Sequence, residues 1–189
     1  MSEEQLSQHR DAIDAIDEQI IQLLNQRASH ARTIGEIKGS GIVYRPEREA
    51  QVLSRVKSLN KGPLSGETMA KLFREIMSAC LALERPLTIA YLGPEGTFSQ
   101  AAAIKQFGHA ANTLACGSID EAFRVVEAKT ADYVVAPVEN STEGAVGRTL
   151  DLMVNTPLKI CGEVVLRIHH HLLRKVEGKA GLLRVYSHA

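Results

Sequence analysis

The sequence predicts a two-part protein, with an all-α unit over residues 1–86 followed by a partial α/β unit over residues 87–189. The first observation behind this prediction is the run from Leu6 to about Lys38, which has helical periodicity and contains no proline. The second is a change of period after Pro86, where short apolar segments begin to alternate with amphipathic ones. Such alternation is typical of a mostly parallel sheet with helices packed on it.

The composition is that of a globular protein without a dominant charge. Of the 189 residues, 44% are apolar and 23% are charged, and 22 basic residues balance 22 acidic ones. A chain with no net charge has no overall field that would attract nucleic acid or an anionic membrane. We therefore expect neither of these partners, and any site for an anion must be local.

The cysteines and the N-terminus bear on the cellular compartment. Cys80, Cys116 and Cys161 are odd in number and show no CxxC spacing, which argues against a disulfide framework or a zinc site. The N-terminal segment is polar and acidic, and no stretch approaches the about 18 apolar residues of a membrane span. We expect a cytoplasmic protein with reduced thiols.

The all-α unit is expected to contain three helices. The run from Leu6 to Lys38 would form a helix of about 50 Å, which one small domain cannot cover, so an intertwined partner or a coiled coil is implied. A second helix is expected near Pro46, a favourable first-turn residue, and a third after Ser65, which can cap it. Pro86 ends this unit.

The α/β unit is expected to alternate strands and helices. The expected helices cover 99–107 and 119–129, and the expected strands cover 87–92, 133–138, one or two parts of 160–173 and the start of 182–186. Three consecutive histidines from His169 to His171 are a possible metal-binding cluster, but no second cluster of ligands accompanies them. We predict no metal site.

Charged residues occupy positions of the first helix that should be apolar. Two heptad series on this helix place Arg10, Asp17, Arg27 and Lys38 on its seam. A buried cation costs several kcal/mol unless it is paired, so Arg27 and Lys38 need an anionic partner inside the bundle. These two lie about 16 Å apart along the axis and face one cavity, whereas Arg10 is about 25 Å from Arg27 and can serve only a partner's site.

Polar residues of the second and third helices continue this pattern. Arg48 and Glu49 flank the apolar face of the second helix, and Cys80 and Glu84 extend the apolar row of the third. Any one of these residues alone is better explained as an exposed residue at the end of an apolar row or as a member of a salt bridge. Together they favour an intersubunit pocket for a small polyanion, in which arginine recognises carboxylates with a forked geometry that lysine cannot imitate.

The charged positions resemble those of the all-helical class of chorismate mutase across residues 6 to 86. The match rests on Arg10, Asp17, Arg27, Lys38, the pair Arg48 and Glu49, and Glu84. The resemblance implies an intertwined homodimer of three-helix chains that converts chorismate to prephenate without a metal or a cofactor. It also implies that the partner subunit's Arg10 and the chain's own Arg27 hold the two carboxylates, that Arg48 supports the pocket, and that Glu49 accepts from the ring hydroxyl.

The same resemblance assigns the catalytic donors. Lys38 and Glu84 would donate to the ether oxygen, where negative charge develops as the C–O bond breaks. Many relatives have Gln where this chain has Glu84, and some have Ser where it has the pocket residue Cys80. A carboxylate at position 84 would repel the developing charge, so Glu84 must be protonated to donate. We therefore expect mutase activity that improves at mildly acidic pH.

Two glycine-containing turns follow expected strands in the second unit. They are GPEGTFSQAA, from Gly93 to Ala102, and PVENSTEG, from Pro137 to Gly144. In an open parallel sheet, ligands bind beyond the carboxyl ends of the strands, and a turn into a helix N-terminus offers N–H groups to an anion. Either turn alone could be a tight connection, and neither has the lysine of a P-loop.

Together the two turns, with HHHLL and YSHA further on, resemble prephenate dehydratase, which has a periplasmic-binding-protein-like fold. The resemblance implies that prephenate contacts Thr97, Ser99, Asn140, Ser141, Thr142 and Gly144. The Thr-Arg-Phe motif that supplies the family's main catalytic threonine is absent, as is a C-terminal regulatory domain. We therefore expect a truncated lobe without dehydratase activity, and poor order beyond about Leu166 because the sheet edges are uncovered.

The sequence predicts part of a bifunctional enzyme of phenylalanine biosynthesis, and two alternatives stay open. One is a non-catalytic or regulatory dimer that binds an aromatic metabolite, and the other is a monofunctional mutase with a vestigial tail. Replacing a cation of the seam distinguishes the first alternative from an enzyme. Arg27→Leu should stabilise a helix that serves only for dimerisation, whereas it should abolish turnover in a mutase.

Overall fold

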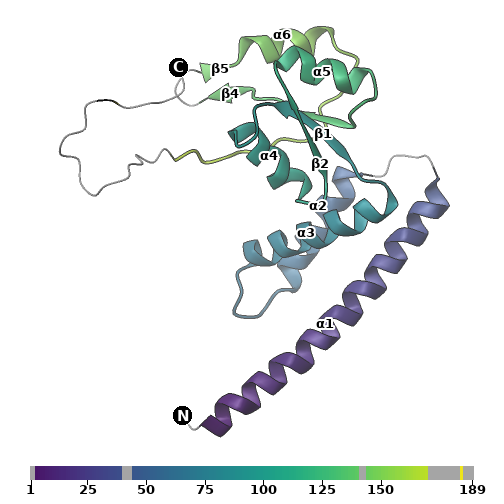
Figure 1. Cartoon of the computed structure of the whole chain (residues 1–189), viewed down its shortest axis with the longest axis vertical. Helices are drawn as coiled ribbons and strands as arrows, with labels where there is room; N and C mark the ends of the chain where they lie inside the picture. The colour runs from purple at the N-terminus through teal and green to yellow at the C-terminus, as the bar shows by residue number, and fades with distance from the viewer. Residues whose placement is uncertain (1–2, 40–43, 141–143, 170–183, 185–189) are drawn as a thin grey trace.

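The computed structural model describes residues 3–39, 44–140, 144–169 and 184 (Figure 1). The chain begins with three helices, α1 (Glu3–Lys38), α2 (Pro46–Leu59) and α3 (Gly66–Glu84). α3 packs against both α1 and α2. A mixed α/β part follows, and this order confirms the predicted succession of an all-α part and an α/β part.

The ends of the helices follow from local sequence. Glu3 and Glu4 lie in the first turn of α1 and Lys38 in its last turn, so the charges complement the helix dipole. Pro46 occupies the start of α2, as predicted. The Ser65 hydroxyl accepts a hydrogen bond from the backbone N–H of Thr68 at 3.0 Å and caps α3, also as predicted.

The helix α1 contains 36 residues, and its N-terminal part lies apart from the other elements (Figure 1). Every residue from Glu3 to Leu23 is exposed, including Ile13, Ile16 and Ile20. An isolated helix with this much exposed apolar surface is marginally stable in water. The contacts within one chain therefore account only for the C-terminal part of α1.

The α/β part is built on a three-stranded parallel sheet. Along the chain, it contains β1 (Thr88–Leu92), α4 (Phe98–Phe107), β2 (Asn112–Cys116), α5 (Ile119–Glu127) and β3 (Tyr133–Val135), with strand order β2-β1-β3. Ile89 of β1 packs with Ala103 of α4, and Ala90 packs with Ala122 of α5. Because successive strand residues face opposite sides of a sheet, α4 and α5 cover opposite faces.

Four elements of this part were not expected from the sequence, and a fifth ends earlier than expected. The four are β2, the antiparallel pair β4 (Glu139–Asn140) and β5 (Gly144–Ala145), and the helix α6 (Gly147–Asn155), and the fifth is β3, which ends at Val135. Asparagine and alanine have low strand propensity, so β2 forms because it pairs along all of β1. Pro137 has no N–H for a ladder and shortens β3. An ion pair between Arg148 and Asp120 joins α6 to α5.

The prediction of strands within 160–173 is wrong for residues 160–169, which form neither helix nor strand. A strand needs a neighbour for its N–H and C=O groups, and this segment is instead fixed by Lys105, whose Nζ donates to the Val165 carbonyl at 2.6 Å. Val154, Ile160 and Val165 are largely exposed. Residues 170–173, the segment 182–186 except Arg184, and most of the chain beyond Leu166 lie outside the described residues.

In the described part of the chain, no helix is both long and apolar enough to cross a bilayer. Nor do three His, Cys, Asp or Glu side chains gather there as ligands for a metal ion. Of the three consecutive histidines, His170 and His171 lie outside the described residues.

Candidate active site

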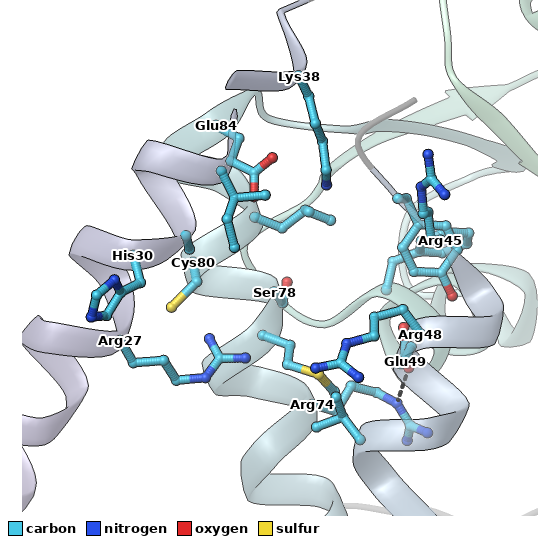
Figure 2. Close-up of a pocket in the computed structure, with 17 residues that line it drawn as sticks. Arg27, His30, Lys38, Arg45, Arg48, Glu49, Arg74, Ser78, Cys80 and Glu84 are labelled. Atoms are coloured by element: carbon cyan, nitrogen blue, oxygen red, sulfur yellow. Dashed lines mark hydrogen bonds and ion pairs between the residues drawn. The ribbon is translucent and has the colours of Figure 1, made fainter. Parts of the chain in front are cut away.

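A cavity of about 300 Å³ opens between the three helices (Figure 2). Its walls come from the C-terminal half of α1, the start of α2, the inner face of α3, the segment before α2 and the end of α4. The lining residues are Arg27, His30, Ala31, Ile34, Lys38, Tyr44, Arg45, Arg48, Glu49, Val52, Arg74, Met77, Ser78, Cys80, Leu81, Glu84 and Phe107. This volume suits a small molecule.

Six residues that the sequence singled out for a polyanion site line this one cavity. They are Arg27, Lys38, Arg48, Glu49, Cys80 and Glu84. Figure 2 shows Arg27, Lys38 and Arg48 reaching toward the same space from α1 and α2. Arg10 and Asp17 do not line the cavity and lie in the exposed part of α1.

Cations outnumber carboxylates in the cavity wall. Arg27, Lys38, Arg45, Arg48 and Arg74 face only two acidic residues, Glu49 and Glu84. Arg74 Nε donates to Glu49 Oε1 at 3.1 Å, and the Glu49 side chain is only 12% exposed. Among the described residues, neither Arg27 nor Lys38 has an ion-pair partner within 4.0 Å. The cavity therefore has an excess of positive charge that an anionic ligand would balance.

Glu84 lies where α1 and α3 pack together, and one of its carboxylate oxygens makes no hydrogen bond in the described structure. Within the described structure its Oε2 atom is buried and has no hydrogen-bond partner. Gly35 makes room for this side chain, since a Cβ at that position would lie 2.7 Å from Glu84 Cγ. Glu84 therefore packs directly on the α1 backbone, and its free oxygen is a group that a ligand in the cavity can satisfy.

Sequence reasoning missed several lining residues, for two different reasons. Arg74 shares a helical face with Met77, Leu81 and Glu84, so the spacing within α3 could have identified it. Tyr44 and Phe107 come from the segment before α2 and from the end of α4. Only the packing of the two parts of the chain brings these two residues to the cavity.

The two glycine-containing turns lie at the same edge of the parallel sheet. One leaves the carboxyl end of β1 and the other follows β3, and these strands are neighbours. Thr97 and Ser99 belong to the first turn and the start of α4, and Asn140 and Gly144 pair between β4 and β5. Ser141 and Thr142 lie outside the described residues.

The hydroxyl of Thr97 is already occupied within the first turn. It donates to the Leu92 carbonyl at 3.2 Å and accepts from the Gln100 N–H at 3.4 Å, so it caps α4. The Gly96 N–H donates to Gln100 Oε1 at 2.6 Å. These polar groups support the turn itself, in contrast to the unpaired groups of the helical cavity.

Two thiols of the α/β part have raised pKa values, and burial is the largest cause in both. It raises the pKa of Cys116 on β2 and of Cys161, and nearby carboxylates act in the same direction. Both groups are therefore neutral thiols near neutral pH and are poor nucleophiles.

Known families match both parts of the chain. The model of chorismate mutase type II matches residues 9–85, and the model of prephenate dehydratase matches residues 89–189. Three similar proteins are each named bifunctional chorismate mutase/prephenate dehydratase. The protein from Neisseria gonorrhoeae is 66% identical over 188 residues, which are 99% of this chain and 52% of the relative.

The second similar protein, from Pseudomonas aeruginosa, is 52% identical over 195 residues, covering 99% of this chain and 53% of the relative. The third, from Escherichia coli, is 33% identical over 212 residues, covering 99% and 54%. The chain thus spans about half the length of the curated relatives it matches. With one part matched by each family model and with these relatives along nearly its whole length, the chain belongs to the bifunctional chorismate mutase/prephenate dehydratase family.

Proposed function

We propose that the chain binds chorismate in the helical cavity and rearranges it to prephenate. The observation that carries this proposal is the group of cations around Glu84 in a cavity that the bundle would otherwise fill with apolar side chains. Chorismate is a small dicarboxylate, so its charges match the excess of arginine and lysine. The names of the relatives support the same substrate.

In the proposed mechanism the cavity holds the reactive conformer. Arg27 and the partner subunit's Arg10 bind the two carboxylates, Arg48 supports the pocket and Cys80 forms part of its wall. Glu49, fixed by Arg74, accepts from the ring hydroxyl. Holding both ends of the molecule removes the freedom that slows an intramolecular rearrangement in water. The reaction requires no nucleophile, metal or cofactor.

Lys38 and Glu84 act on the ether oxygen, where negative charge develops as the C–O bond breaks. The Lys38 ammonium donates directly. Glu84 donates only when it carries a proton, and its unpaired buried oxygen is consistent with a partner that the substrate supplies. Turnover should therefore improve as the pH falls into the mildly acidic range.

The proposal includes a homodimer. The apolar residues Ile13, Ile16 and Ile20 are exposed on α1, although they follow the spacing of a buried stripe. A second copy packed on α1 would cover them and would deliver the partner subunit's Arg10 to the cavity. We further infer a cytoplasmic location, because Cys80, Cys116 and Cys161 are all free thiols, as is usual in a reducing compartment.

For the second part, residues 87–189, we propose a prephenate dehydratase segment that does not turn over prephenate in this chain. The residues Thr97, Ser99, Asn140, Ser141, Thr142 and Gly144 would face prephenate. The Thr-Arg-Phe motif of the family is absent from the sequence, and Thr97 already caps α4. Residues 1–86 form the proposed mutase domain.

The test is to follow the disappearance of chorismate by ultraviolet absorbance with the purified chain. Phenylpyruvate is then measured with and without acid treatment, which converts prephenate to phenylpyruvate. We expect prephenate alone. Phenylpyruvate without acid would show an active dehydratase, and no turnover from about pH 5 to 8 would favour the regulatory dimer.

Arg27→Leu separates the mutase from a helix that only dimerises. In a mutase it abolishes turnover because a carboxylate of chorismate loses its partner. In a helix that serves only for dimerisation, the same substitution raises stability and has no other effect, since an apolar side chain replaces an unpaired cation. Unfolding temperature and turnover are measured on the same sample.

A further inference from the structure

Phe107 brings the α/β part to the wall of the helical cavity. It is the last residue of α4, and among the described residues that line the cavity it is the only one from beyond residue 86. Its side chain is half-buried, so part of the ring is available to a molecule in the cavity. The helical part supplies all the charged side chains of the described wall, whereas the α/β part supplies an aromatic ring.

Two tyrosine rings hold the ring of Phe107. The centroid of Tyr44 lies 5.2 Å from that of Phe107, and the centroid of Tyr133 on β3 also lies 5.2 Å from it. The two tyrosines contact each other at 5.4 Å with their rings nearly perpendicular. Aromatic pairs at these distances stabilise the packing beyond the area they bury, so the contacts fix where the Phe107 ring lies.

The next residue, Gly108, allows the end of α4 to approach α3 closely. Gly108 is buried and has a φ of +77°, a conformation that favours glycine. A Cβ at this position would lie 2.5 Å from Ser78 Cβ and 2.6 Å from Ser78 Oγ. Ser78 belongs to α3 and lines the cavity. The end of α4 is therefore packed directly against one wall of the cavity.

Hydrogen bonds on both sides of Phe107 join the end of α4 to the helical part. The backbone N–H of His109 donates to Glu75 Oε2 at 3.2 Å, and the ring Nδ1 of His109 lies 3.1 Å from Glu75 Oε1. Gln106 Nε2 donates to the Tyr44 hydroxyl at 3.2 Å. Each of the four residues 106–109, which we call the α4 corner, thus contacts the helical part.

We propose that Phe107 is a substrate-contacting residue of the mutase cavity, so that the α/β part contributes directly to the binding of chorismate. This inference rests on the proposed function, in which cations of the helical part hold the two carboxylates. Chorismate also has a ring, whose face needs a partner without charge. Phe107 supplies that partner, because an apolar contact removes water from the ring face. The segment proposed not to turn over prephenate thereby serves the mutase reaction.

The first experiment measures chorismate turnover by the full chain with Phe107→Ala and with Phe107→Leu. We expect KM to rise about tenfold in the alanine variant and about twofold to threefold in the leucine variant, which keeps part of the apolar area. In both, kcat should stay within about twofold, because a contact to the ring face is made equally before and during the reaction. An unchanged KM in Phe107→Ala would overturn the inference, and so would a fall in kcat without a change in KM.

Gly108→Ala tests whether the α4 corner positions Phe107. The new Cβ would collide with Ser78, so the corner must move and KM should rise about fivefold to tenfold. Gly96→Ala is the matched control, because Gly96 has a φ of +82° but a Cβ there meets nothing within 4 Å. Both variants carry similar backbone strain, and only Gly108→Ala should change KM. Equal KM values would overturn the inference, since a displaced Phe107 would then have no effect on binding.

A tryptophan at position 107 gives a readout that does not depend on turnover. The sequence contains no tryptophan, so Phe107→Trp introduces a single indole fluorophore. Addition of chorismate should change its emission, because the ligand displaces water from the indole. In Phe98→Trp, at the other end of α4, the emission should stay the same, since Phe98 is not among the described residues of the cavity wall. An unchanged emission in Phe107→Trp, or an equal change in both variants, would overturn the inference.

The two readouts separate this inference from the proposed function. If the unchanged chain turns over chorismate and Phe107→Ala has the same KM, the inference fails alone. If the unchanged chain does not turn over chorismate but the emission of Phe107→Trp responds to it, the mutase proposal fails and the contact of Phe107 with the ligand stands. Denaturant unfolding of each variant shows that a rise in KM comes from folded protein.

Discussion

The helical cavity and the turn after β1 contain similar polar groups, but those of the turn have partners within the protein and some of those in the cavity have none in the described structure. In the turn, the Thr97 hydroxyl and the Gly96 N–H are both satisfied by the protein. In the cavity, Lys38 has no ion-pair partner among the described residues and Glu84 Oε2 has no hydrogen bond. A fold keeps unsatisfied polar groups at a cost in stability.

The difference indicates which residues serve the fold and which await a ligand. Removing a satisfied group such as the Thr97 hydroxyl should weaken folding and leave turnover unchanged. Removing an unsatisfied group should affect turnover and leave folding nearly unchanged. Four substitutions test this comparison.

The largest effect is expected for Lys38→Ala. This change removes a donor to the ether oxygen, so kcat should fall by about 10² to 10³. Unfolding temperature should change little, because Lys38 has no ion-pair partner in the described structure. Arg32→Ala is the matched control on the same helix, since within the described structure Arg32 pairs only with Glu36, on the exposed surface at 3.7 Å. A loss in Arg32→Ala as large as in Lys38→Ala would contradict the assignment.

Gly35→Ala should reduce kcat about tenfold to a hundredfold through displacement of Glu84. The new Cβ would lie 2.7 Å from Glu84 Cγ, so this side chain must move. Alanine favours a helix over glycine by about 1 kcal/mol, so a weaker α1 cannot explain the loss. Gly147→Ala is the control, because a Cβ there meets nothing within 4 Å. Unchanged turnover in Gly35→Ala would show that the position of Glu84 is unimportant.

Glu84→Gln should change the pH profile of kcat/KM. The carboxyl of Glu84 donates only as an acid, so turnover by the unchanged chain should be greater at mildly acidic pH. Glutamine donates at every pH, so the variant should be nearly flat from about pH 5 to 8 and about tenfold faster than the unchanged chain at the alkaline end. Glu36→Gln, on the exposed face of α1, should keep the original profile. A profile unaltered by Glu84→Gln would remove Glu84 from the mechanism.

The smallest effect on turnover is expected for Thr97→Ala. Loss of the cap of α4 should lower the free energy of unfolding by about 1 kcal/mol. The mutase rate should stay within about twofold, because Thr97 does not line the cavity. Chemical denaturation and chorismate turnover measure both quantities. Stability equal to that of the unchanged chain would show that the cap is not important.

The sequence predicted the helical part more fully than the α/β part, because helical periodicity is a local property. The spacing of Arg27 and Lys38 on α1, and of Cys80 and Glu84 on α3, was enough to bring them to one cavity. The strand β2 and the helix α6 were missed because each depends on neighbours, β2 on β1 and α6 on Asp120 of α5. No local pattern could place Tyr44 or Phe107 at the cavity.

The exposed N-terminal half of α1 has a consequence for how the protein behaves on dilution. From Glu3 to Leu23 no residue is buried, so one chain supplies little free energy to keep this half helical. If a second copy supplies it, helix content is linked to protein concentration by mass action. Lowering the concentration would then melt this half of α1 and remove Arg10 from the partner's cavity at the same time, so that dilution would act on the protein as a denaturant does.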